Sequence, residues 1–372
     1  ERGYDVTFLP VDRGGNLDPD KLREAIREDT AVVSVMWANN ETGVVFPVEE
    51  LAAICNRRGV LFHTDAVQAV GKVPINLGQS KIDMLSLSGH KLHAPKGIGV
   101  LYLKRGVRFR PLLRGGHQER GRRAGTENTA SIVALGMACE QAMQHMHHEN
   151  TEVKRLRDKL EAGILAKVPR AFATGDVSNR LPNTSNIAFE FIEGEAILLL
   201  LNKFGIAASS GSACTSGSLE PSHVMRAMGI PYTAAHGTTR FSLSRYTTEA
   251  EIDRVIQVVP EIVAQLQSGR TTIELGNTWP KRDYIHVRDA ASGFVAAALK
   301  GALPAGEAVP INLGPSHQYS VAEVVAKLSE HSGLEITIQS DPGRVRPVDR
   351  PFLGADNARA RDLLGWSPKF GI

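Results

Sequence analysis

The sequence predicts an α/β fold followed by a smaller α+β unit, with a further α/β segment at the carboxyl end. Over residues 1–110, short β-rich runs alternate with helical stretches, which is the pattern of an α/β layer fold. Longer helical patterns follow from about residue 128, and the pattern changes again after residue 267. With 372 residues and about 150 residues per domain, two or three domains are expected.

The predicted elements of the first part place polar side chains at strand ends. Four strands and one helix are expected, at 31–37, 60–65, 83–87, 97–103 and, for the helix, 48–58. Three of these strands are followed or ended by polar groups: Asn39-Asn40-Glu41, Asp65 and Ser88-Gly89-His90-Lys91. Open parallel sheets bind ligands at the carboxyl ends of their strands. We therefore expect the chemistry to lie there.

The rest of the chain is expected to be helical at first and mixed later. The predicted elements are helices at 131–146 and 152–167, a strand at 185–190, a Gly/Ser-rich loop at 209–218 and a helix at 248–266. Thr248 and Glu251 form a capping-box pattern, and Pro260 is expected to kink or divide the last helix. Beyond Ser268-Gly269-Arg270, a helix at 290–300 and a second capping box at Ser320 and Glu323 are predicted.

Composition excludes several classes of protein. Hydrophobic residues make up 42% and charged residues 22%, values of an ordinary globular chain rather than a disordered, collagen-like or coiled-coil one. Apolar runs such as 196–201 are far shorter than a membrane span. A net charge of +3 with interspersed signs gives no case for nucleic-acid binding. Three cysteines, an odd number, argue against a disulfide framework and for a reducing, cytoplasmic setting.

Lys91 and Asp65 are the first candidates for chemistry. A lysine at a strand end can bond to an aldehyde cofactor if its surroundings favour the neutral amine, and a carboxylate such as Asp65 can pair with a protonated pyridine nitrogen. Gln68 could reach a ring hydroxyl, and Ser88 and His90 suit a phosphate. The alternative is structural: Asp65 caps a turn and Lys91 is a surface lysine. The spacing alone leaves both open.

Cysteine and arginine supply the remaining candidates. Cys214 lies among small residues, which are expected to leave its thiol unshielded, whereas Cys55 and Cys139 lie on apolar helix patterns and are expected to pack. Arg240 and Arg245 alternate with apolar residues in a strand-like segment, and arginine suits bidentate capture of a carboxylate. Each could equally be a tolerated loop cysteine or an exposed strand charge. The run from His145 to Glu149 lacks metalloprotease spacing, so no metal site is expected.

Several motifs in the same order carry a family resemblance. They are Trp37-Ala38-Asn39-Asn40-Glu41-Thr42-Gly43, His63-Thr64-Asp65-Ala66-Val67-Gln68, Ser88-Gly89-His90-Lys91, Arg123-Ala124-Gly125-Thr126-Glu127-Asn128, 209–217 and 240–245. Through them, residues 1–267 resemble the cysteine desulfurases of the NifS/IscS type, which are class V aminotransferase-like enzymes of fold-type I that use pyridoxal phosphate. The residues of these motifs are more similar to those of the nitrogen-fixation branch than to those of the housekeeping branch. The resemblance implies a large pyridoxal phosphate domain at 1–145 and a small domain at 146–267.

The resemblance also implies a role for each candidate residue. Lys91 would hold the cofactor covalently and Asp65 would pair with its ring nitrogen. The other cofactor contacts would come from Asn40, Gln68, Ser88, His90 and Thr126, the last reaching the cofactor of a partner subunit in a homodimer. Arg240 would bind the carboxylate of the substrate L-cysteine. Cys214 would take its sulfur as a persulfide for an iron–sulfur scaffold protein, release alanine, and could transiently ligate a cluster.

One departure from the family pattern concerns the start of the chain. No leader precedes the β-rich stretch at 6–9, so we expect the sequence to enter in mid-domain. Family members begin earlier, with a Gly-Thr-Glu-type phosphate loop and a histidine that stacks on the cofactor ring. Without these groups, cofactor binding is expected to weaken and sheet edges to be exposed. A truncated chain with no activity of its own is therefore the alternative to an active desulfurase.

The carboxyl-terminal segment resembles a different family. Its motifs are Arg282-Asp283-Tyr284-Ile285-His286-Val287, Asn312-Leu313-Gly314, 344–349 and 363–368. They resemble the carboxyl-terminal part of nucleotide-sugar epimerases and dehydratases of the extended short-chain dehydrogenase type. The dinucleotide glycine loop and the Tyr-x-x-x-Lys pair are absent from the sequence. Residues 268–372 are thus expected to be a substrate-domain fragment without a catalytic centre. In the related family the Arg-x-Arg-Pro region lies by the nucleotide diphosphate, so Arg344 and Arg346 are either relics of a substrate site or, as we expect, exposed basic residues. A sugar-nucleotide-binding module is the remaining alternative.

Overall fold

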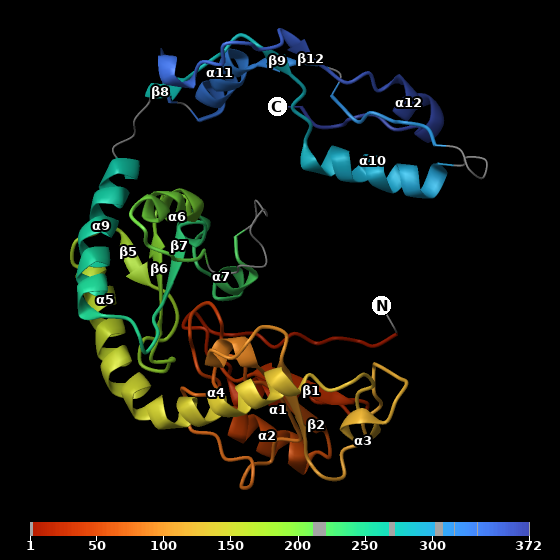
Figure 1. The fold of residues 1–372 in the computed structure, drawn as a ribbon, viewed down its shortest axis with the longest axis vertical. Coiled ribbons are helices and arrows are strands. Elements are labelled where there is room, and N and C mark those ends of the chain that lie inside the picture. The colour runs from red at the N-terminus through yellow and green to blue at the C-terminus, as the bar shows by residue number, and fades with distance from the viewer. Residues whose placement is uncertain are drawn as a thin grey trace. The chain divides into compact units, whose positions relative to one another are not determined.

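A computed structural model describes residues 3–210, 221–267, 272–301, 308–315, 317–332 and 334–371. The chain divides into two compact units, Glu1–Ser268 and Gly269–Ile372 (Figure 1). The predicted division of the first unit at residue 145 lies within one continuous helical segment, and it stays a prediction. Among the described residues, no helix is both long enough and apolar enough to cross a membrane.

A four-stranded sheet forms the amino-terminal half of the first unit. Its strands are β1 (Val32–Met36), β2 (Leu61–Asp65), β3 (Met84–Ser88) and β4 (Gly99–Leu103), in the order β1-β2-β3-β4. The four predicted strands are confirmed within two residues, and β1, β2 and β3 are parallel as expected. The expectation of a parallel sheet is wrong for β4, which is antiparallel to β3. Only residues 89–98 join these two strands, too few for the crossover that a parallel pair needs.

Two helices pack beside this sheet and supply its core. They are α1 (Pro19–Ala25) and α2 (Val48–Arg57). Asp18 caps α1 by accepting from the Asp20 amide, and α2 buries Val48, Leu51 and Cys55 in a cluster shared with Phe62 of β2. Burial of a side chain of this size contributes about 1.5–3 kcal/mol. The packing of α2 thereby helps to hold in place the strands whose ends carry the candidate site.

The outer edge of β1 is open within the described residues. No described strand pairs with that edge, and Val32 is 50% exposed. The β-rich stretch at 6–9, which could have formed a strand, is extended but unpaired, and Phe8 is 89% exposed. A groove of about 1230 Å³, lined largely by residues 3–9 and 29–36, runs along this edge. The apolar side chains at 6–9 therefore do not by themselves produce a strand, because no described strand pairs with this stretch.

A long helical segment leads from the large sheet to the second half of the unit. It consists of α4 (Thr129–His148), a π-helical turn (Glu149–Val153) and α5 (Lys154–Leu165), and it follows a short helix, α3 (Gln118–Gly121). Figure 1 shows α4 passing into α5 as one curved rod. The prediction of two helices separated at 147–151 is wrong, because no glycine or proline occurs at these positions and the π turn continues the backbone hydrogen bonds of the helix.

A three-stranded antiparallel sheet completes the first unit. It contains β5 (Ala171–Ala173), β6 (Thr184–Phe189) and β7 (Thr238–Ser242), in that order. Its helices are α6 (Gly194–Lys203), α7 (His223–Ala227), α8 (Tyr232–Ala235) and α9 (Glu249–Gln267). The capping box is confirmed, because Thr248 donates to Glu251 from its amide and the Glu251 amide donates back to the Thr248 hydroxyl. Pro260 does not divide α9, which runs through it.

The second unit, residues 269–372, combines short strands with three helices. Its elements are β8 (Thr272–Leu275), β9 (Lys281–Arg282), α10 (Val287–Lys300), β10 (Tyr319–Ser320), α11 (Val321–Ser332), β11 (Thr337–Ser340), η3 (Pro342–Arg344), β12 (Phe352–Leu353) and α12 (Ala358–Leu364). They form one sheet of order β10-β9-β12 and a parallel pair of β11 and β8. The predicted capping box is confirmed by reciprocal hydrogen bonds between Ser320 and Glu323.

A buried ion pair stabilises the junction between α5 and the antiparallel sheet. Both Glu161 oxygens accept from Arg180, at 2.6 and 2.7 Å, and Ser185 donates to one of them at 2.6 Å. Burial alone would raise the pKa of Glu161, but the hydrogen bonds from Arg180 and Ser185 outweigh it and hold this pKa below its ordinary value of 4.5. The carboxylate is thus ionised at neutral pH, and its charge compensates that of the guanidinium.

We predict that Glu161→Gln lowers the free energy of unfolding by about 3 kcal/mol, because it leaves Arg180 buried without a counter-charge. Urea unfolding at pH 7 measures the loss, and Glu24→Gln, which breaks only an exposed pair with Lys21, should cost less than about 1 kcal/mol. Since the folded pKa of Glu161 is depressed, its contribution is present above the unfolded pKa and falls as pH drops through the folded one. Equal losses for both variants would contradict this role.

Candidate functional site

The candidate site begins at the carboxyl ends of β2 and β3, which are neighbours in the sheet. Asp65 ends β2 and is paired in register with Ser86 of β3. Its carboxylate accepts from the Val67 amide at 2.9 Å, and its carbonyl accepts from Trp37 at 2.8 Å. The hydrogen bond from the Val67 amide caps the turn after β2, which is the structural role that the sequence left open for Asp65. One carboxylate oxygen carries that cap, which orients the group at the strand end.

Ser88 ends β3, and His90 and Lys91 follow it on a short 3₁₀ helix, η1 (Gly89–Leu92). The Ser88 hydroxyl and the His90 Nδ1 atom are 2.6 Å apart, so the two predicted phosphate ligands already contact each other. Gly89 permits the tight turn, because a Cβ there would lie 2.7 Å from the Ile98 side chain. The turn therefore presents His90 and Lys91, both exposed, directly beyond the strand end.

The surroundings of Lys91 disfavour the charged form of its amine. The side chain reaches solvent, but partial burial of the amine lowers its pKa below the ordinary 10.5, and the positive charge of Arg240 lowers it further. A neutral amine is the form that attacks a carbonyl group. The direction of this shift agrees with the predicted role of Lys91, which stays a prediction.

Arg240 of β7 connects the antiparallel sheet to the turn after β1. Its guanidinium donates from Nη1 to the Asn40 carbonyl and from Nη2 to the Ser209 hydroxyl, the latter at 3.3 Å. Burial lowers the pKa of Arg240, while Glu41 opposes this effect. The buried Nε atom has no hydrogen-bond partner among the described residues. A guanidinium held in this way retains an unused donor toward the site.

The turn that carries Asn40 is fixed by buried polar contacts that the sequence did not reveal. The Asn39 side-chain oxygen accepts from the amides of Glu41 and Thr42, both at 2.9 Å. Glu41 is 1% exposed, and the Ser222 hydroxyl donates to its carboxylate at 2.6 Å. Burial raises the pKa of Glu41, against the effects of Ser222, His223 and Arg240. Glu41 stood in the quoted motif, but nothing in the sequence indicated Ser222 as its partner.

His63 is a second residue that sequence reasoning did not single out. Its Nδ1 atom is 2.8 Å from the Ser34 hydroxyl and its Nε2 atom 3.2 Å from the Ser86 hydroxyl, so it bridges three adjacent strands. Burial lowers the pKa of His63, although Asp65 opposes the shift. The histidine sits two residues before Asp65 on the same face of β2. It thereby supports the strand end from within the sheet.

The remaining predicted site residues have different outcomes. Gln68 is half-buried in the turn after β2, and its carbonyl accepts from Lys72 at 3.4 Å. Thr126 is exposed on the loop before α4. Cys214 lies outside the described residues. The roles of all three stay predictions.

The two other cysteines are helical, as expected. Cys55 is buried on α2, where burial and, to a smaller extent, Asp83 raise the pKa of its thiol to about 11. Cys139 lies on α4, and burial raises the pKa of its thiol as well. Since the thiolate is the reactive form, neither is suited to nucleophilic chemistry at neutral pH. No group of three or more potential metal ligands occurs in the described part of the chain.

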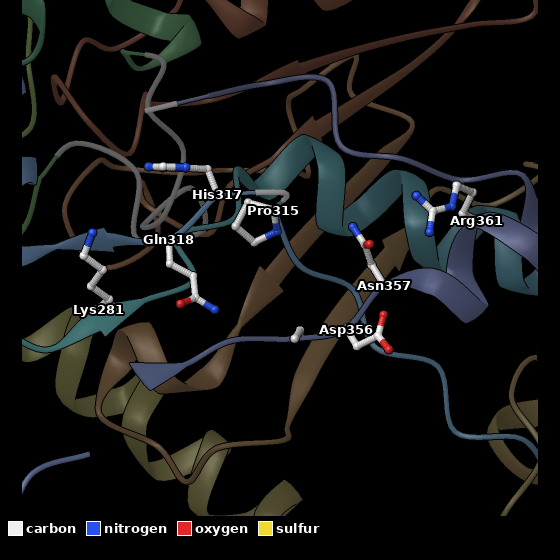
Figure 2. Close-up of a pocket in the computed structure, with 8 residues that line it drawn as sticks. Lys281, Pro315, His317, Gln318, Asp356, Asn357 and Arg361 are labelled. Atoms are coloured by element: carbon white, nitrogen blue, oxygen red, sulfur yellow. The ribbon is translucent and has the colours of Figure 1, made fainter. Parts of the chain in front are cut away.

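The second unit has a polar pocket of its own. It measures about 510 Å³ and is lined by Lys281, Pro315, His317, Gln318, Ala355, Asp356, Asn357 and Arg361 (Figure 2). Lys281 is partly neutralised by Glu323 at 3.3 Å, and Asn357 donates to the Gly314 carbonyl. Arg282, from the first motif of this segment, pairs with Asp349 from a later one at 2.5 Å. Arg344 and Arg346 are exposed, as expected.

Comparison with known proteins identifies the family. A family profile described as aminotransferase class-V matches residues 1–255, more than half of the sequence. The chain belongs to the aminotransferase class-V family. A second profile, GDP-mannose 4,6 dehydratase, matches residues 225–372 and so overlaps the end of the first match.

Individual members of the class-V family give a narrower comparison. The chain is 76% identical to "Cysteine desulfurase NifS" of Azotobacter vinelandii over 266 residues, which cover 72% of this chain and 66% of that protein. The solved "NIFS-like protein" has a TM-score of 0.66 and 37% identity over 71% of this chain and 70% of its own. "SspA in complex with cysteine" has a TM-score of 0.56 and 34% identity over 66% and 68%. The chain thus spans about 66% of the length of its NifS relative.

The donor set fits the cofactor that the resemblance implies. A carboxylate at Asp65, a hydroxyl–imidazole pair at Ser88 and His90, an amine of lowered pKa at Lys91 and a guanidinium with an unused Nε at Arg240 meet beside one sheet edge. These are the groups that match a pyridine nitrogen, a phosphate, an aldehyde and a substrate carboxylate. The structure therefore agrees in chemistry with a pyridoxal phosphate site.

We predict that Arg240→Gln raises the pKa of Lys91, because it removes the positive charge that disfavours the ammonium form. Competitive acylation across a pH series, read by mass spectrometry on the Lys91 peptide, measures that pKa in the cofactor-free chain. Arg254→Gln on the exposed face of α9 removes the same charge elsewhere and should leave it unchanged. An unaltered Lys91 pKa in Arg240→Gln would show that the two groups do not interact.

Proposed function

We propose that the chain is a pyridoxal phosphate-dependent cysteine desulfurase that converts L-cysteine to L-alanine. The observation that carries the proposal is the meeting of Arg240, from the antiparallel sheet, with Asn40 and Lys91, from the parallel strands. A guanidinium of the kind that suits a substrate carboxylate thus lies near an amine of lowered pKa, which supports the proposal. The 76% identity to a NifS cysteine desulfurase and the likeness to a protein solved with cysteine support the choice of substrate.

The proposed mechanism assigns one task to each residue. Bound pyridoxal phosphate supplies an electron sink that stabilises negative charge at the substrate Cα. Lys91 would hold the cofactor and would afterwards move protons at the substrate carbons. Asp65, oriented by the Val67 amide, would keep the ring nitrogen protonated, while Ser88 and His90 would bind the phosphate. Asn40 and Gln68 would contact the ring oxygen, and Thr126 would reach the cofactor of the partner subunit in a homodimer.

The sulfur transfer is assigned to Cys214. Arg240 binds the substrate carboxylate and fixes the thiol group toward the nucleophile. The Cys214 thiolate attacks the substrate sulfur, so that an S–S bond forms, the Cβ–S bond breaks, and Cβ takes up a proton to yield alanine. The resulting persulfide is passed to an acceptor, which we propose to be a scaffold protein for iron–sulfur clusters in the cytoplasm, serving nitrogen fixation. Transient cluster ligation by Cys214 belongs to the same proposal.

A second candidate is a chain of the same fold without activity of its own. The open edge of β1 and the groove of about 1230 Å³ beside it favour this alternative, because apolar surface of this kind weakens an isolated sheet. The resemblance associates an amino-terminal segment with the phosphate loop and the stacking histidine. Addition of that segment as a separate chain separates the two candidates: an inactive chain that becomes active with it is an incomplete desulfurase.

We predict that Cys214→Ala abolishes sulfide release from L-cysteine, because it removes the only cysteine outside the helices at 48–57 and 129–148. Sulfide is measured with the parent chain supplemented with pyridoxal phosphate and the amino-terminal segment. In the parent, the rate should rise with pH toward the pKa of the thiol. The variant should still show the visible absorbance of bound cofactor.

Cys139→Ala is the matched control, since it removes a thiol whose pKa is raised by burial. It should retain the parent rate and lose at most some stability. A full sulfide rate in Cys214→Ala would remove this residue from the mechanism. No rate in the supplemented parent would favour the inactive candidate.

We predict that deletion of residues 269–372 leaves the desulfurase rate and the cofactor absorbance unchanged, because the first unit contains the whole described site and is compact by itself. The deleted segment also lacks a dinucleotide glycine loop. Calorimetry with NAD should accordingly show no binding to the full chain. Binding of NAD, or a large loss of desulfurase rate on deletion, would assign this segment a role that we do not expect.

A further inference from the structure

Four titratable residues on segments that adjoin those of the proposed site have no part in its mechanism. Lys72, His93, Glu149 and Arg245 come from four separate segments, and we call them the charged cluster. Three members closely follow a site residue along the chain: Lys72 follows Gln68, His93 follows Lys91, and Arg245 follows Arg240. Glu149 begins the π-helical turn between α4 and α5. The cluster thus contains one acidic and three basic side chains.

Contacts with α4 and the π turn hold these segments together. Asn150, next to Glu149, donates to the Lys72 carbonyl at 2.9 Å, and the Lys72 amine in turn donates to the Gln68 carbonyl at 3.4 Å. Arg245 donates to the Gln141 carbonyl of α4 at 3.5 Å. These contacts connect the α4–α5 junction to the turn after β2 and to the loop after β7.

The segment that carries Lys91 is held in the same way. Leu92 of η1 packs in a buried cluster with Leu135, Ala138 and Ala142 of α4. The His93 ring lies edge-on to Tyr246, with ring centroids 5.7 Å apart, and the Arg245 guanidinium lies 5.9 Å from the centre of the same Tyr246 ring. All three site segments therefore rest on one helical support.

Glu149 is the unusual member of the charged cluster. It is only 6% exposed, and its Oε2 atom has no hydrogen-bond partner in the described part of the chain. A buried carboxylate without a close partner is costly unless nearby positive charges compensate it. The charge of Glu149 affects the pKa values of Lys72 and His93. Burial lowers the pKa of each, and Glu149 opposes that shift in both. π-helical turns are also frequent at functional sites.

We propose that Glu149 is a positioning residue whose carboxylate offsets the positive charge of the charged cluster, chiefly that of Lys72, and thereby holds the segments of Gln68, Lys91 and Arg240 against the α4–α5 junction. As a positioning role for that site, this inference rests on the proposed function. Replacement of the carboxylate by an amide of equal size leaves the positive charges of Lys72 and Arg245 without a nearby negative charge. The site segments then separate from their common support, and the cofactor contacts lose their alignment.

The experiment compares the cofactor-free parent chain with Glu149→Gln by NMR titration of labelled histidine, with the His93 resonance assigned through His93→Asn. The groups facing His93 are Arg245, Lys72 and Glu149. Loss of the negative charge should shift the pKa of His93 downward. Mere loosening of the packing would expose the ring and shift it upward, because burial is the main cause of its lowered value. The sign of the shift therefore separates a counter-charge from a packing role.

Three further variants complete the test. Glu152→Gln removes an equal charge from the same π turn, where Glu152 is exposed and paired with Arg155, and should leave the His93 pKa unchanged. Lys72→Gln should shift the His93 pKa upward, opposite to Glu149→Gln. Glu149→Asp retains the charge and should restore the parent value in part. If Glu149→Gln does not fold, Lys72→Gln and Glu149→Asp still decide: an upward shift in the first with a value near the parent in the second supports the proposal, and an upward shift in both overturns it.

A second readout connects the cluster to the site. We expect Glu149→Gln to bind pyridoxal phosphate about tenfold more weakly than the parent, a change of about 1.4 kcal/mol, while Glu152→Gln binds it as the parent does. An unchanged or raised His93 pKa in folded Glu149→Gln overturns the proposal. A parent chain that binds no cofactor even with the amino-terminal segment overturns the proposed function instead, and leaves the titration result to be read by itself.

Discussion

The proposed site depends on one interaction between residues 200 positions apart, the hydrogen bond from Arg240 to the Asn40 carbonyl. Burial disfavours the charge of the Arg240 guanidinium, so its donors must find acceptors when the chain folds. The turn after β1, which carries the Asn40 carbonyl, is held by Asn39 and by the Glu41–Ser222 contact. The parallel strands and the antiparallel sheet are thereby joined where the substrate carboxylate is proposed to bind.

Much of the fold follows from local patterns in the sequence, but the site does so only in part. Strands β1 to β4 and both capping boxes are set by residues close in sequence, and Ser88 contacts His90 two residues on. The antiparallel β4 depends on the length of a connection, and the π turn on the absence of a helix breaker. The Glu41–Ser222 and Arg240–Asn40 contacts join distant segments, which periodicity and motif spacing do not encode.

The buried carboxylates of Glu161 and Glu149 differ in how completely their charge is compensated. Glu161 receives two hydrogen bonds from Arg180 and one from Ser185, so its charge is fully compensated and its effect is on stability. Glu149 is equally buried but has an oxygen without a close partner, and its compensation comes from groups farther away. Incomplete compensation of buried charge is typical of functional sites, and Glu149 adjoins the proposed one whereas Glu161 does not.

Basic side chains of the second unit are neutralised by carboxylates of the same unit. Arg282 is neutralised by Asp349, Lys281 by Glu323 and Arg344 by Asp341, each within the segment after residue 269. These pairs close within the segment after residue 269. In the first unit, Arg240 keeps a buried donor without a described partner, and its other donors join the two sheets beside Lys91. The place of this donor at the proposed site, rather than the number of basic residues, supports the proposal that a ligand carboxylate binds there.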